Sequence, residues 1–175
     1  NVKGTVISIH GRSSSPEFVL GINKEDYTRK MGKVWVDSGY EVYAPLVQNG
    51  NGMDFRILGF SPQGYDLFQL NNLLKLLHNK DLEKIIVHGI SYGALLAEAL
   101  AIVDTDNKIH TTISSQSMFA IQDWMYFQNF NKNLKTAKLN GRGERGFDAL
   151  PDIFNALYGG IINYSLIHPK KLILS

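Results

Sequence analysis

Cysteine is absent from the 175 residues of this chain, so disulfide frameworks, zinc–thiolate sites and cysteine nucleophiles are excluded. Charged residues make up only 19% of the sequence and the formal net charge is +2. Such a weak charge bias argues against a nucleic-acid partner. No apolar run reaches the roughly 18 residues that a membrane-spanning helix needs, so we expect no membrane span. The sequence does not indicate whether the protein is cytoplasmic or secreted.

Motifs for cofactors are also missing. No dinucleotide fingerprint and no P-loop is present, and the turn-rich loop at residues 49–52 has no metal-ligand spacing. We therefore expect no cofactor and no metal. The hydrophobic content of 44% is ordinary for a globular protein, and the length suffices for one domain with its own core. We expect a single domain over residues 1–175.

Strand-like and helix-like segments alternate along the chain. Runs of β-branched and apolar residues predict strands, and apolar residues at helical spacing predict helices between them. The expected strands are residues 5–9, 41–44, 84–88, 109–115 and 171–174, and the expected helices are residues 23–38, 64–78 (with Asp66 as its cap) and 91–103. The alternation predicts an α/β fold with a mainly parallel sheet and flanking helices.

The segment between the last two expected strands is unusually long. A simple crossover does not need all of residues 117–168, so we expect a cap or lid there. The core of the domain would then comprise residues 1–116 and 169–175. Aromatic side chains gather at the start of this insertion, and Trp124 and Phe127 are candidate pocket residues. An ordinary apolar core explains the same aromatic residues equally well.

The stretch "VHGISYGALLAEAL" (residues 87–100) carries the strongest functional signal. Ser91 stands between Gly89 and Gly93, where an expected strand meets an expected helix. A sharp turn there would expose the serine oxygen in a strained conformation, and side chains two residues away on either side would collide with their neighbours. We predict that Ser91 is a nucleophile and that the backbone N–H of Tyr92 donates to the oxyanion.

A second signal lies upstream, in "TVISIHGRSSSPEF". The first strand runs into His10 and Gly11. The loop after this strand should supply the second oxyanion donor. Gly11 lets the backbone turn inward, which makes the Arg12 N–H the preferred donor, and His10 would line the site or hold the loop. A plain strand-ending turn is the alternative explanation.

Six segments, in order, resemble the α/β-hydrolase superfamily of serine esterases, lipases, thioesterases and peptidases. They are "VISIHG", "SGYEVYAPLVQNGNGMD", "YDLFQLNNLLKLL", "IIVHGISYGALLAEALA", "HTTISSQSMF" and "HPKKLILS". The resemblance implies an α/β-hydrolase fold and a serine hydrolase that cleaves an ester, thioester or amide through an acyl-enzyme. Its substrate would be a small acyl compound. Ala94 is a mild departure, because in this superfamily a glycine often follows the second glycine of the serine-bearing turn, which is called the nucleophile elbow.

The order nucleophile, acid, histidine, which the superfamily follows, is incomplete here. Both later members are expected beyond residue 175, so the C-terminal strands would be incomplete and the chain a segment of a longer hydrolase, with a second polypeptide as one source of the missing part. Asp123 is the internal candidate for the acid, and a solvated or helix-capping aspartate is its alternative. His168 precedes a parallel strand and should lie at the wrong end of the sheet.

Two other functions remain open at this point. The same fold serves as a binding or scaffold domain when the catalytic set of nucleophile, acid and histidine is incomplete. The chain would then not be an enzyme. An acyltransferase would use the same elbow and differ in what removes the acyl group.

Overall fold

The structure is a computed structural model, and it describes residues 2–12, 14–22, 24, 26–48, 62–78, 84–116 and 170–175. Within these residues, five strands form one parallel sheet in the order β2-β1-β3-β4-β5. The strands are β1 (Thr5–Ile9), β2 (Glu41–Tyr43), β3 (Ile85–Ile90), β4 (Ile109–Ser115) and β5 (Lys171–Leu174). The predicted α/β architecture with a parallel sheet is confirmed.

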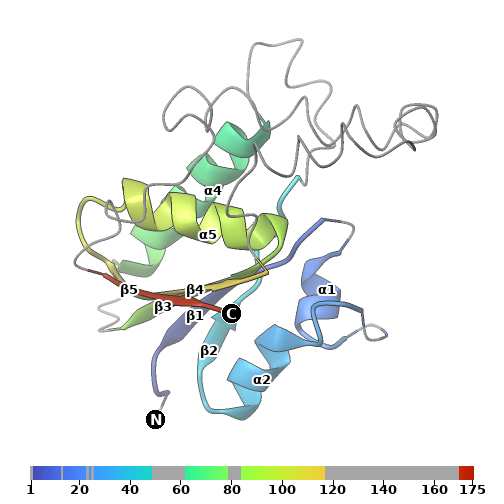
Figure 1. Cartoon of the computed structure of the whole chain (residues 1–175). Coiled ribbons are helices and arrows are strands. Elements are labelled where there is room, and N and C mark those ends of the chain that lie inside the picture. Colours follow the sequence, from blue (N-terminus) through green and yellow to red (C-terminus); the bar gives the residue numbers. More distant parts are fainter. Residues whose placement is uncertain are drawn as a thin grey trace, which may run out of the picture.

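Helices cover both faces of the sheet. Helices α4 (Pro62–His78) and α5 (Tyr92–Val103) lie on one face, and α1 (Pro16–Val19) and α2 (Met31–Asp37) lie on the other (Figure 1). The handedness of parallel crossovers explains this division. The chain moves along the sheet in one direction from β1 to β2, and in the opposite direction from β2 to β3 and on to β4.

The main core lies between the sheet and the pair α4 and α5. Alternate residues of β1 and β3 point to this face, because successive side chains of a strand lie on opposite sides. They pack against one row of leucines from each helix. The buried side chains include Ile7, Ile9, Ile85, Val87, Leu70, Leu74, Leu77, Leu96 and Leu100.

The expected helix over residues 23–38 is wrong in its first half. Asp26 accepts hydrogen bonds from the backbone N–H of Thr28 (2.8 Å) and from the Thr28 hydroxyl (2.5 Å), which closes a turn instead. Arg29 and Lys30 both have positive φ, 49° and 54°. Helix α2 therefore begins only at Met31, because a side chain that bonds nearby backbone competes with helical bonding.

The expected cap at Asp66 is also wrong. Helix α4 begins at Pro62, a residue type well suited to the first helical turn because its fixed φ is helical and it needs no acceptor. Asp66 therefore lies inside the helix, where it is 2% exposed and accepts hydrogen bonds from other segments.

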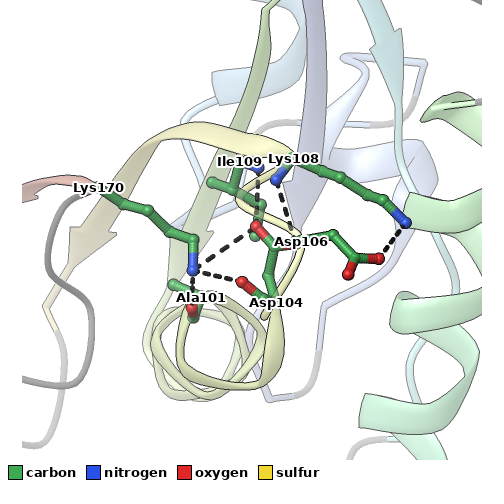
Figure 2. A network of polar contacts seen from close by, with 6 residues as sticks. All are labelled: Ala101, Asp104, Asp106, Lys108, Ile109 and Lys170. Atoms are coloured by element: carbon green, nitrogen blue, oxygen red, sulfur yellow. Dashed lines mark hydrogen bonds and ion pairs between the residues drawn. The ribbon is translucent and has the colours of Figure 1, made fainter.

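A buried lysine attaches the edge strand β5 to the end of α5. Lys170 Nζ donates to the carbonyl oxygens of Ala101 (2.7 Å) and Asp104 (2.6 Å) and lies 3.7 Å from the Asp104 carboxylate (Figure 2). The same carboxylate accepts the backbone N–H of Ile109 at 2.9 Å, at the start of β4. A cation at the carboxyl end of a helix satisfies its last carbonyl groups and complements its dipole. This network therefore fixes the amino end of β5.

Candidate active site

Ser91 forms the sharp turn between β3 and α5. Its backbone angles are φ 56° and ψ −117°, which match the first central residue of a type II′ turn, where glycine is favoured. Its N–H donates to the carbonyl of Ser115 at 2.9 Å, and its own carbonyl accepts the N–H groups of Ala94 and Leu95. The predicted strand-to-helix turn is present, and hydrogen bonds on both sides keep the serine in this strained conformation.

Gly89 and Gly93 leave no room for a side chain. A Cβ on Gly89 would overlap the carbonyl of Gly93 and lie 2.6 Å from the Ala94 nitrogen. A Cβ on Gly93 would overlap the carbonyl of Ile9 and lie 2.6 Å from that of His10. Both obstacles are backbone atoms, which do not move aside as flexible side chains do. The two glycines therefore let the end of β1, the end of β3 and the first turn of α5 approach closely.

Gly11 lies directly against Ser91. In the parallel register Ile9 pairs with Gly89, so the residues that follow β1 and β3 emerge at the same edge of the sheet. A Cβ on Gly11 would lie 2.8 Å from the carbonyl of Ile90 and 3.1 Å from Ser91 Cβ. The structure thus places the loop with Gly11 and Arg12 beside Ser91.

His10 is buried beneath this loop, with 1% of its surface exposed. Its Nε2 accepts the N–H of Val47 at 3.2 Å, so its Nδ1 carries the proton and donates to the carbonyl of Gly11 at 2.9 Å. Burial lowers the pKa of His10 below 6.5, which keeps the ring neutral near pH 7. Because C=O and N–H point in opposite directions in a trans peptide, the bond to Gly11 directs the Arg12 N–H away from His10.

Two residues of the 26–30 turn hold the other side of the loop. The Tyr27 hydroxyl donates to the carbonyl of Arg12 at 2.7 Å, and it occupies the space where a Gly11 side chain would lie. Ser14 donates to Asp26 at 2.5 Å. Burial, helped by the charge of Asp26, raises the pKa of Tyr27 to about 12, so the phenol remains a donor. Sequence reasoning missed this role, because apolar spacing placed residue 27 within the expected helix over residues 23–38.

Tyr92 is the first residue of α5, so its backbone N–H has no acceptor within the helix. Helix N-termini carry partial positive charge, which favours an anion beside them. The side chain is 7% exposed, and its hydroxyl donates to Asp66 Oδ2 at 2.8 Å. Burial and the neighbouring Asp66 carboxylate raise the pKa of Tyr92. The structure therefore anchors the residue after the serine through a buried hydrogen bond that sequence reasoning missed.

No histidine in the described part of the chain hydrogen-bonds Ser91. His88 Nδ1 accepts the indole N–H of Trp35 at 2.9 Å, so its Nε2 carries the proton and donates to Ser115 Oγ at 3.1 Å. Burial lowers its pKa to about 4. Both ring nitrogens of His88 are thus engaged with residues other than Ser91.

Several sequence predictions lie outside the described residues. These include the acid candidate Asp123, the pocket candidates Trp124 and Phe127, the proposed lid over residues 117–168, and His168. Lys170, two residues after His168, contacts the carboxyl end of α5. Ser91 precedes the opposite end of this 12-residue helix, whose length is about 18 Å at 1.5 Å per residue.

A cavity of about 420 Å³ adjoins this site on the α2 face of the sheet. It reaches the elbow at Ile90 and the loop-holding turn at Tyr27, and its walls also include Trp35, His88 and Ser115. The described residues contain no group of three or more histidine, aspartate or glutamate side chains that could hold a metal ion. None of the described helices is both long enough and apolar enough to cross a membrane.

No protein-family model matches the sequence, and no curated protein matches it. Solved structures do resemble the fold. An esterase from Pyrococcus furiosus matches 99% of this chain and 60% of its own length, with a TM-score of 0.58 and 21% identity. Acetyl xylan esterase 1 from a Thermoanaerobacterium species matches 99% of this chain and 59% of its own length, with a TM-score of 0.54 and 16% identity.

A third structure, from Xanthomonas campestris and assigned to the α/β hydrolase superfamily, matches 69% of this chain and 62% of its own length. Its TM-score is 0.52 and its identity is 15%. The chain therefore spans about three fifths of the length of the structures it resembles. Similarity at this level of identity establishes the fold alone.

Proposed function

Because this chain has the α/β-hydrolase fold, we propose that it is a serine hydrolase that cleaves an ester, thioester or amide through an acyl-enzyme on Ser91. The observation that carries the proposal is the backbone of Ser91, at φ 56° and ψ −117° between β3 and α5. A residue is kept in so strained a conformation only where the surroundings enforce it, and such strain concentrates at functional sites. A carboxylic ester is the substrate class we favour.

In the proposed mechanism, Ser91 Oγ attacks the acyl carbonyl and forms a tetrahedral intermediate. The backbone N–H groups of Tyr92 and Arg12 donate to its oxyanion, with Gly11 allowing the close approach. Preorganised donors of this kind each contribute about 10²–10³-fold in rate. Collapse expels the leaving group and leaves the acyl group on Ser91, and water then releases the acid.

No histidine of the described residues hydrogen-bonds Ser91, so we assign the general base and its acid partner to residues outside the described part of the chain. Asp123 stays a candidate for the acid. The finding that no described histidine hydrogen-bonds Ser91 favours one alternative, a binding domain that has the turn at Ser91 but does not catalyse a reaction. An acyltransferase differs only in the acceptor that removes the acyl group.

Hydrolysis of 4-nitrophenyl acetate and 4-nitrophenyl butyrate tests the proposal. We expect turnover by the protein and its loss in Ser91→Ala, while Ser38→Ala, a serine at the end of α2, keeps the rate of the wild type. Equal turnover by the protein and Ser91→Ala would refute the assignment of Ser91. Product analysis in water with a competing alcohol separates hydrolysis from acyl transfer.

A further inference from the structure

Two neighbouring backbone N–H groups after β2 bind two different parts of the site. The N–H of Val47 donates to His10 Nε2 at 3.2 Å, and the N–H of Gln48 donates to Asp66 Oδ1 at 2.7 Å. His10 follows β1, whereas Asp66 belongs to α4. Residues 47 and 48, which we name the bridge, therefore connect two elements that are distant in the sequence.

His10 and Asp66, the two side chains that the bridge holds, are each connected to one proposed oxyanion donor. On one side, His10 Nδ1 donates to the carbonyl of Gly11 at 2.9 Å and so fixes the peptide whose N–H belongs to Arg12. On the other side, Asp66 Oδ2 accepts the hydroxyl of Tyr92 at 2.8 Å. Tyr92 supplies the other backbone N–H. A single hydrogen bond thus connects each donor's peptide or residue to a side chain that the bridge holds.

All three connecting side chains are buried: His10 is 1%, Asp66 2% and Tyr92 7% exposed. Hydrogen bonds to a charged carboxylate are stronger than those between neutral groups, and a buried polar group that loses its partner is costly. The connections therefore resist displacement. An ordinary helix cap would not explain them, since Asp66 lies within α4 and bonds to groups far away in the sequence.

We propose that the bridge fixes the distance between the two oxyanion donors, and that Asp66 is a positioning residue, which acts through Tyr92. This inference rests on the proposed function. Oxyanion donors must lie within about 2.7–3.1 Å of the developing charge, and a misplacement of about 1 Å can lower a rate about 10²-fold. A bridge of two adjacent residues provides this accuracy because one short piece of backbone holds both sides.

Two variants alter the hydrogen bonds of Asp66. Tyr92→Phe removes the hydroxyl and keeps both the ring and the backbone N–H, and Asp66→Asn keeps the shape and removes the charge. Tyr43→Phe is a matched control, because Tyr43 also donates to a carboxylate, Glu41, at 2.7 Å. Tyr43 lies on β2, which β1 separates from β3, and it lines one pocket with Asp66 and the bridge. It therefore controls for the loss of a nearby tyrosine hydroxyl that leaves the Asp66–Tyr92 bond intact. Thermal unfolding of each variant shows that it is folded.

The first readout is steady-state hydrolysis of 4-nitrophenyl acetate. We expect kcat to fall about tenfold or more in Tyr92→Phe and in Asp66→Asn with KM nearly unchanged, because the lost alignment matters in the transition state. The double variant should fall no further than Asp66→Asn alone, since the bond that Tyr92→Phe removes is one of the two that Asp66→Asn already alters. Tyr43→Phe should keep the wild-type kcat. An unchanged kcat in both site variants overturns the proposal.

The second readout needs no activity. In a ¹H–¹⁵N correlation spectrum, Tyr92→Phe and Asp66→Asn should each move the amide signals of Gln48 and Arg12, whereas Tyr43→Phe should leave the Arg12 signal in place. If the unaltered protein has no turnover, the hydrolase proposal fails, and a shifted Arg12 signal still supports the bridge. An Arg12 signal that stays in place in both site variants overturns the bridge, whatever the turnover.

Discussion

Because the backbone of Ser91 is strained, we predict that Ser91→Gly stabilises the protein and that Ser91→Ala does not. Ser91→Ala and Ser91→Gly lose the same hydroxyl, so they differ in the Cβ alone. A residue with a Cβ at φ 56° and ψ −117° carries strain of about 1–3 kcal/mol. Glycine avoids this strain but loses about 0.5–1 kcal/mol through the greater freedom of the unfolded chain. We therefore expect Ser91→Gly to be more stable than Ser91→Ala by about 1 kcal/mol.

Urea unfolding followed by circular dichroism measures this difference, and thermal unfolding should show a shift of about 2–4 °C for a protein of this size. Ser38 is the matched control, because it lies at the end of α2 with φ −84° and ψ 0°. There Ser38→Gly should be less stable than Ser38→Ala, by about 0.5–1 kcal/mol. If Ser91→Gly is also less stable than Ser91→Ala, the serine is not strained and the elbow geometry is wrong.

Three further predictions follow from the described contacts. Gly93→Ala should lower the free energy of unfolding by about 2 kcal/mol or more in urea, because its Cβ meets backbone oxygens. Lys170→Met should lower it by about 3 kcal/mol, since Asp104 and two carbonyl groups lose a buried cation. The pH dependence of unfolding should be shallower in His88→Gln. Folded His88 has a pKa of about 4 and unfolded histidine one of about 6.5. Unfolding therefore takes up a proton between these values, and the wild type loses stability as the pH falls from about 6.5 to 4, by up to about 1.4 kcal/mol per unit.

Each of these predictions has an outcome that contradicts it. Wild-type stability in Gly93→Ala would mean that the end of β1 does not approach α5 as described. Lys170→Arg is the control for Lys170→Met, and a loss of similar size in both would point to packing rather than charge. For His88, the slopes of stability against pH are compared between pH 4 and 8, and identical slopes in the two proteins would show that the folded imidazole titrates normally.

The strands were predictable because their sequences are locally distinctive. The run Thr5–Ile9 is β-branched between two glycines, and Ile109–Ser115 was predicted with the bounds that the structure shows. The helix expected at residues 23–38 failed because Asp26 bonds its own neighbouring backbone, a preference that apolar spacing does not report. The elbow was predictable from two glycines at fixed distances from a serine, since close backbone approach requires that residue type.

The residues that hold the site were not predictable in the same way. Val47 has no side-chain chemistry, and its contribution is a backbone N–H aimed at a histidine 37 residues away. Asp66 was interpreted as a helix cap because aspartate is common there, and only the packing of α4 beside α5 shows its bond to Tyr92. Tyr27 likewise acts through a hydrogen bond to the carbonyl of Arg12, 15 residues away in the sequence. Such roles depend on tertiary contacts that a single sequence does not encode locally.

Labelling with a fluorophosphonate probe tests the central claim, that Ser91 is an activated nucleophile. The protein and its Ser91→Ala variant are treated in parallel, and intact mass gives the number of labels and any second polypeptide that accompanies the chain. We predict one label on the wild-type protein and none on Ser91→Ala. Labelling of both proteins would place the nucleophile elsewhere, and a folded wild-type protein that takes no label would contradict the claim that Ser91 is activated.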